Sequence, residues 1–185
     1  LGGPSVLPYV PDGLLPQAFD SFVQQTSSGE SAIYRRGLYT AWRRTGHYPS
    51  FAAFDAPDRS VCTIKRARTN TPLQALVTLN DPVYIEAAQA MGRRLIEEQG
   101  DDIEQRIQRA FHLALARDAS AQESAVLRVV YDEALAEYQN EPGEAMKMAT
   151  DPRGPLPEGF DVADAAAMTV VCNVVLNLDE FLTKP

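Results

Sequence analysis

Hydrophobic and polar positions recur at helical spacing over most of the chain beyond residue 70. The first clear helix start lies at Thr71, because Pro72 suits the first helical position and Gln74 completes a T-x-x-Q capping box. A proline disfavours the α conformation of the residue before it, so this helix must stop near Asn80, ahead of Pro82. The pattern predicts a short helix that ends in a rigid corner.

Further helices follow from the same signals. Asp81 is a good N-cap for a second helix, and Gly100 is a plausible C-cap for it. Asp102 places negative charge at the start of a third helix, and Ser120 forms a second capping box with Glu123. The three helices are predicted over residues 82–98, 102–117 and 121–139.

The last long helix is predicted from about Val162 to Leu178 and is apolar on nearly every face. It is too short and too polar for a membrane span, so it is interpreted as the buried centre of a bundle, packed on the three preceding helices. Asn173 and Asn177, four residues apart, would need hydrogen-bond partners there. A short additional helix is expected in EAMKMAT, ahead of a proline- and glycine-rich loop.

The first part of the chain has weaker patterns. Residues 1–31 hold four prolines and read as an extended arm. Residues 32–81 carry most of the unusual polar groups, with a two-stranded β element predicted near 36–42 and 60–65. The predicted fold is therefore mainly α: an irregular bundle of about five or six helices over 82–185 with this small β element, forming a single domain.

Charge is spread unevenly over these regions. The net charge is −8, but residues 35–68 hold eight Lys and Arg against two Asp, which is +6 and leaves −14 for the rest. The basic third either docks on acidic helices of the same domain or offers a site for an anionic ligand. Nucleic acid is not an expected partner, because the chain as a whole is acidic and carries no recognisable binding module.

The densest mixture of functional side chains lies between Phe51 and Asp81. Its members could pair with one another as a structural clasp, since buried charges need partners. Alternatively, the carboxylates could do acid–base work or hold a divalent cation, while the arginines grip an anion or a sugar acid. The cluster consists of Asp55, Asp58, Arg59, Arg66, Arg68, Asn70, Asn80 and Asp81.

The cysteines and histidines exclude several cofactor sites. With two of each and no CxxC or CxxCH motif, the chain offers neither a zinc site nor a c-type haem attachment, and no metal ligands are assigned. Cys62 and Cys172 leave three alternatives open. They could form a disulfide, remain two separate buried thiols, or leave Cys62 as a nucleophile with a thiolate stabilised by nearby basic residues.

Three segments together resemble the family called DUF1553 or PSD1: YRRGLYTAWRRT, FDAPDRSVCTIKRARTNTPLQALVTLND and VVLNLDEFL. That family is described in large exported planctomycete proteins that also carry cytochrome-c-like domains. The similarity runs from LGGPSV to LNLDEF and corresponds to the C-terminal portion of the family domain. The resemblance implies that the chain is a fragment of a larger domain.

The same resemblance implies an extracytoplasmic location, periplasmic or at the cell surface, with haem c confined to attached domains. It brings no established activity and no catalytic residues. We therefore expect a non-catalytic accessory, scaffold or interaction domain whose partners are other domains of the same parent protein. The alternative is a carbohydrate- or anion-binding module, or part of an enzyme site, built on the Asp55–Arg68 cluster.

Overall fold

The computed structural model describes most of the chain, and its secondary structure there is mainly helical. Contacts divide the chain into two compact units, an N-terminal unit, Leu1–Thr69, and a helical unit, Asn70–Pro185. The predicted helix after Thr71 thus belongs with the helical unit. The described residues are 3–6, 34–42, 48–57, 61–65 and 69–183.

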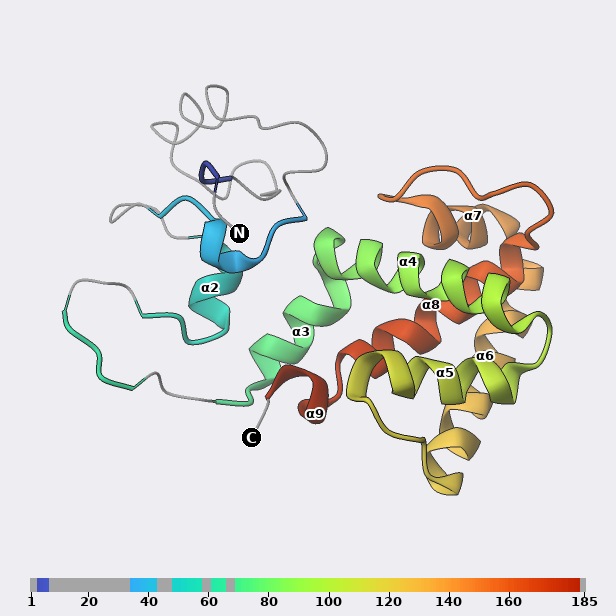
Figure 1. Ribbon diagram of the computed structural model, residues 1–185. Helices are drawn as coiled ribbons and strands as arrows, with labels where there is room; N and C mark the ends of the chain where they lie inside the picture. The colour runs from blue at the N-terminus through green and yellow to red at the C-terminus, as the bar shows by residue number, and fades with distance from the viewer. Residues whose placement is uncertain (1–2, 7–33, 43–47, 58–60, 66–68, 184–185) are drawn as a thin grey trace. The chain divides into compact units, whose positions relative to one another are not determined.

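The helical unit contains seven helices in its described residues, and Figure 1 shows α8 lying among α4, α5, α6 and α7. Each predicted helix of this region is present, which confirms the mainly α fold. The helices are α3 (Pro72–Asn80), α4 (Pro82–Gln99), α5 (Ile103–Leu115), α6 (Ala121–Asn140), α7 (Pro142–Thr150), α8 (Val162–Leu176) and α9 (Asp179–Leu182).

The predicted helix starts and stops are confirmed at the level of single hydrogen bonds. In the first capping box, Gln74 N–H donates to Thr71 Oγ1 over 3.3 Å, while Thr71 N–H donates to Gln74 Oε1 over 3.0 Å. Ser120 and Glu123 form the same reciprocal pair at the start of α6. Gly100 ends α4 with a φ of 58°, a backbone angle that glycine adopts without steric cost.

Helix α8 is the centre of the helical unit, as its composition predicted. It packs most extensively against α4, α6 and α7, and also contacts α5. Gly92 lets α4 approach closely: a Cβ there would lie 3.4 Å from the backbone of Met168 and Thr169. Ten residues of α8 are buried, from Ala165 to Leu176, and its buried apolar residues belong to both core clusters of the helical unit.

One buried charged residue is held by a complete set of partners. Arg106 on α5 is 1% exposed and donates to both carboxylate oxygens of Asp164 on α8, over 2.6 and 3.1 Å. It also donates through Nε to the carbonyl of Gly100, over 2.6 Å. Tyr131 on α6 donates its hydroxyl to Asp164 over 2.7 Å, and burial together with this bond raises the pKa of the phenol. The cluster joins three helices around one charge pair.

A second polar contact fastens α7 to α4. The buried Gln89 side chain donates to the carbonyls of Met148 and Asp151, over 2.7 and 2.8 Å, and accepts from the N–H of Arg153. One turn later, Arg93 donates to three carbonyls at the end of α7 and in the loop that follows. These bonds satisfy carbonyl groups that the end of a helix leaves without intrahelical partners.

The described part of the N-terminal unit contains the 3-10 helix η2 (Gly37–Tyr39) and the short helix α2 (Pro49–Ala53). The predicted β element near 36–42 and 60–65 is wrong. Residues 37–39 form η2, Thr40 makes an isolated parallel bridge with Val6, and the described residues 61–65 contain no strand. A short β-branched run is ambiguous by itself, and here the backbone next to Thr40 bonds to Val6 instead.

Candidate functional site

Four members of the predicted cluster lie outside the residues that the structure describes: Asp58, Arg59, Arg66 and Arg68. Asp55 has a φ of 57°, in the left-handed region that Asp tolerates better than most residues. Its Oδ2 accepts hydrogen bonds from the N–H of Thr69, over 3.0 Å, and from the Thr69 hydroxyl, over 2.7 Å. These two bonds join Asp55 to Thr69, which is not a member of the predicted cluster.

Three further members of the predicted cluster belong to the helical unit and contact helix ends. Asn70 donates through Nδ2 to Asp179 Oδ1 over 2.7 Å, which ties the start of α3 to α9. Asn80 donates to the carbonyl of Leu76 over 2.8 Å, within its own helix. Asp81 accepts from the N–H of Val83 over 2.9 Å as the N-cap of α4. Each therefore has a local structural role.

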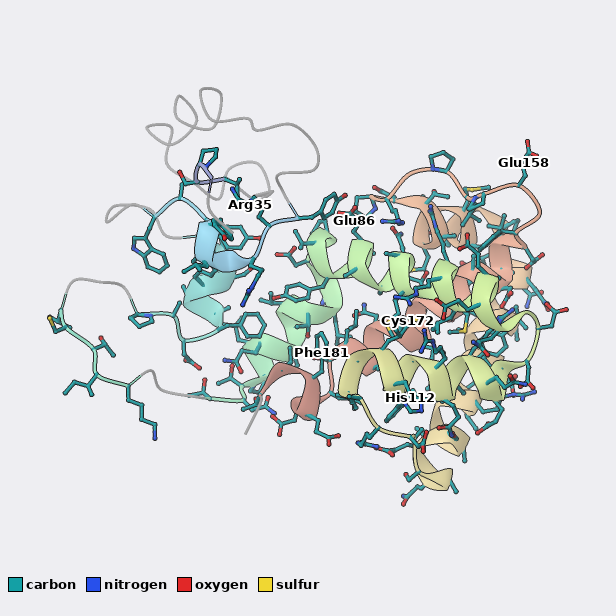
Figure 2. The ribbon with its side chains drawn as sticks, in the orientation of Figure 1. Arg35, Glu86, His112, Glu158, Cys172 and Phe181 are labelled. Atoms are coloured by element: carbon teal, nitrogen blue, oxygen red, sulfur yellow. The ribbon has the colours of Figure 1, made fainter. Side chains whose placement is uncertain are left out.

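Both cysteines are free thiols. Cys62 is exposed, whereas Cys172 is fully buried on α8, and Figure 2 shows it within the helical unit. Burial raises the pKa of the Cys172 thiol, which makes it a poor nucleophile and an ordinary core residue. The alternative of two separate buried thiols fits Cys172 but not Cys62.

Metal-ligating side chains do not gather in the part of the chain that the structure describes. No group of three or more His, Cys, Asp or Glu is placed there to hold an ion. The described helices also include none long and apolar enough to cross a membrane.

The feature that stands out is the orientation of α3, which buries polar residues and exposes apolar ones. Gln74 and Thr78 are 3% and 0% exposed, whereas Leu73, Leu76 and Leu79 are 59%, 58% and 39% exposed. A surface helix normally turns its apolar stripe toward the core. We call Leu73, Leu76 and Leu79 the α3 leucine surface.

Hydrogen bonds to α8 explain why the polar side of α3 faces inward. Thr78, fully buried, donates its hydroxyl to Asn177 Oδ1 at the end of α8. One turn earlier on α8, Asn173 donates through Nδ2 to the carbonyl of Leu79 over 3.2 Å. The predicted need of Asn173 and Asn177 for partners is thereby met by α3, although Asn173 Oδ1 is buried with no hydrogen-bond partner among the described residues.

The α3 leucine surface differs from the other exposed apolar residues of the helical unit. Val126 and Val129 are also exposed, but α6 carries charged residues along its length, such as Arg128 and Asp132, which bond to each other. The sequence of α3, PLQALVTLN, contains no charged residue at all. Isolated exposed apolar residues are ordinary, whereas large contiguous apolar patches are typical of interaction sites.

Carboxylates lie at both ends of this surface. Asp81 directly follows α3, and the exposed Asp179 is bonded to Asn70 just before it. The whole helical unit is acidic: residues 70–185 hold nine Lys and Arg against twenty Asp and Glu, a formal charge of −11. The α3 leucine surface is therefore an apolar area in acidic surroundings.

Sequence reasoning placed α3 but missed its surface. A signal was present, since Leu73, Leu76 and Leu79 recur every three residues while Gln74 and Thr78 are four apart. That pattern defines two faces without saying which one is buried. The helix has nine residues, and the ordinary rule would have turned the leucines inward.

A known protein family matches most of the chain, including the α3 leucine surface. The sequence model of PSD1, described as a protein of unknown function (DUF1553), matches residues 1–131. The chain belongs to the PSD1 family. The match confirms the family resemblance of the first two segments, whereas VVLNLDEFL lies beyond it, and it covers α3, α4 and α5 together with about half of α6.

Membership of PSD1 gives no activity, because the family description itself states an unknown function. No curated protein and no solved structure matches the chain. The α3 leucine surface lies inside the matched region, whereas Asn173 and Asn177, which orient it, lie in α8 beyond the match. Any function must therefore be inferred from the geometry of the PSD1 chain itself.

Proposed function

We propose that this PSD1 chain is a non-catalytic interaction domain and that the α3 leucine surface is its contact with another polypeptide. The observation that carries the proposal is the reversed orientation of α3, with Thr78 buried and Leu76 exposed. Burying a fully exposed leucine side chain contributes about 1.5–3 kcal/mol. Three partly exposed leucines on one helix thus offer a partner several kcal/mol of apolar contact.

The polar groups of the helical unit support the same proposal. Arg106, Asp164 and Tyr131 satisfy one another, and Gln89 and Arg93 bond to main-chain carbonyls of α7 and its following loop. These groups stabilise the fold. A domain whose buried polar groups serve packing and whose apolar side chains face outward suits a binding role.

The wider setting of the domain is part of the proposal. By family resemblance, the domain works outside the cytoplasm in a protein that also carries cytochrome-c-like domains, and its partner is another domain of that protein. Haem c would be bound by those attached domains. The carbohydrate- or anion-binding alternative depends on Asp58, Arg59, Arg66 and Arg68, and no contact of the described residues favours it.

Site-specific photocrosslinking tests the interaction role. p-Benzoylphenylalanine is introduced at Leu76 in one sample and at Val129 in another, and each chain is irradiated in cells of the organism that produces it. Both positions are exposed and apolar, but only Leu76 belongs to the α3 leucine surface. We expect one defined crosslinked product from position 76, either within the parent protein or between two chains, and none from position 129.

Mass spectrometry of that product then identifies the partner and the residues in contact. Equal, diffuse crosslinking from both positions would contradict the proposal, as would the absence of any product from position 76. Circular dichroism of both variants ensures that they fold like the unmodified chain.

A further inference from the structure

We infer that the α3 leucine surface binds an amphipathic helix whose apolar residues are flanked by lysine or arginine. This inference rests on the proposed interaction role and adds the chemistry of the partner. Two independent features of the helical unit carry it. One is the geometry of the exposed leucines, and the other is the charge around them.

The geometry favours a helix over an extended strand. A strand partner would need unpaired N–H and C=O groups along an edge, but α3 uses its own backbone groups in helical hydrogen bonds. What α3 presents is a ridge of side chains, Leu73, Leu76 and Leu79, spaced three residues apart. Ridges of this kind pack into the grooves of a second helix at an interaxial distance of about 8–10 Å.

The length of α3 limits the size of the contact. Nine residues at about 1.5 Å per residue span roughly 13 Å, so two to three turns of a partner helix are enough to cover the ridge. The matching pattern on the partner is a set of three apolar residues at helical spacing. Longer apolar stretches gain no further contact with α3.

The charged residues around the ridge determine which charged residues a partner helix should carry beside its apolar ones. The Asp179 carboxylate lies beside the start of α3, where it accepts hydrogen bonds from two neutral groups, Asn70 Nδ2 and Thr183 Oγ1. The Asp81 carboxylate accepts from a main-chain N–H at the other end. Within a unit of formal charge −11, basic flanks on a partner are attracted to both ends and acidic flanks are repelled.

Fluorescence anisotropy with synthetic peptides tests this chemistry on the full chain. Two labelled peptides share a helical core with three leucines at positions i, i+3 and i+7, and differ in their flanks, which are lysine in one and glutamate in the other. A third peptide keeps the lysine flanks but has serine in place of the leucines. We expect the lysine-flanked leucine peptide to bind about tenfold more tightly than either of the others. Raising NaCl from about 0.05 to 0.5 M should narrow its advantage over the glutamate-flanked peptide, because salt screens exposed charges.

Matched variants place the binding site. Leu76→Ser should weaken binding of the lysine-flanked peptide about tenfold or more, whereas Val129→Ser, which changes an equally exposed apolar residue on α6, should leave it unchanged. Asp179→Asn keeps a hydrogen-bonding side chain but removes the charge. Asp179→Asn should reduce the preference for lysine-flanked over glutamate-flanked peptides. It should leave unchanged how much the leucines of the peptide contribute to binding affinity.

Several results would overturn the inference. One is that the lysine-flanked and glutamate-flanked leucine peptides bind with equal affinity. Another is that Leu76→Ser does not change the affinity for the lysine-flanked peptide. A third is that none of the peptides binds. Sedimentation analysis adds another: if the chain self-associates and Leu76→Ser makes it monomeric, a second copy occupies the surface instead. A discrete crosslink from position 76 combined with a negative peptide result would keep the interaction role and reject only this partner.

Discussion

Helix α8 buries most of its apolar residues, whereas helix α3 exposes its leucines. Helix α8 buries ten of its fifteen residues, and its buried apolar side chains are part of the core. Helix α3 buries Gln74 and Thr78 and exposes three leucines. Both are mainly apolar in sequence, so hydrophobicity alone does not decide which residues are inside.

The difference between the two helices lies in what holds them. Contacts with α4, α6 and α7 surround α8. Helix α3 lies at the end of α8, where Asn173 and Asn177 present polar groups that require partners. A buried polar group without a hydrogen bond costs free energy, so turning Thr78 inward offsets part of the cost of exposing the leucines. The comparison suggests that the polar end of α8 orients the surface proposed for binding.

The largest expected effect comes from the charge pair between α5 and α8. Asp164→Ala leaves the buried guanidinium of Arg106 without its partner, and we expect it to lower the free energy of unfolding by about 3–5 kcal/mol. Urea denaturation followed by circular dichroism measures this. The double variant Arg106→Met with Asp164→Leu should recover most of the loss, because it removes both charges. A single variant as stable as the unmodified chain would contradict the role given to the pair.

The comparison between the helices is tested most directly by two truncations. Met168→Ala on α8 removes a fully buried side chain and should cost about 2–5 kcal/mol. Leu76→Ala on α3 removes an exposed one and should change stability by no more than about 0.5 kcal/mol. Urea unfolding of both variants gives the two losses of unfolding free energy, which can then be compared. Equal losses would show that Leu76 packs inside the molecule and would remove the basis of the α3 leucine surface.

A smaller effect is expected from the hydrogen bond that orients α3. Thr78→Val keeps the shape of the side chain but removes the hydroxyl that bonds to Asn177, and should cost about 0.5–1.5 kcal/mol. Thr150→Val is the matched control, since that hydroxyl donates to the Met146 carbonyl near the surface. Its loss should stay within about 0.5 kcal/mol. If both variants behave alike in thermal and urea unfolding, the orientation of α3 must have another cause.

The smallest expected effect is a pH dependence at the edge of the helical unit. Hydrogen bonds from Arg117 and from the Ser120 cap lower the pKa of Glu123 from 4.5 to about 2. A lowered carboxyl pKa contributes stability that is present above pH 4.5 and lost as the pH falls toward 2. Because the pair is partly exposed, its contribution should be only about 0.2–1 kcal/mol.

Glu123→Gln retains the capping box but loses the ion pair with Arg117. The difference in unfolding free energy between it and the unmodified chain should therefore be largest near pH 6 and vanish near pH 2. A difference that is constant with pH would show that the Glu123 charge adds nothing. The bonds of α3 to Asn173 and Asn177 join neutral groups and should not contribute to this dependence.

Most helix boundaries could be predicted because capping is local. The Thr71–Gln74 and Ser120–Glu123 boxes, the corner at Asp81–Pro82 and the stop at Gly100 each depend on a few neighbouring residues. The β element could not be predicted in the same way, because a strand needs a partner elsewhere in the chain. Thr40 is bridged to Val6 and not to the residues near Val61.

The sequence by itself determined most helix boundaries from α3 to α8, though not the short helices α2 and α9, and that the apolar stretch from Val162 onward forms the buried centre. Only the tertiary structure decided which face of α3 points outward. The reason is physical: two faces of a nine-residue helix can compete for burial, and the choice depends on hydrogen bonds with Asn173 and Asn177, which lie more than ninety residues further along the chain. Contacts over such separations cannot be read from local pattern.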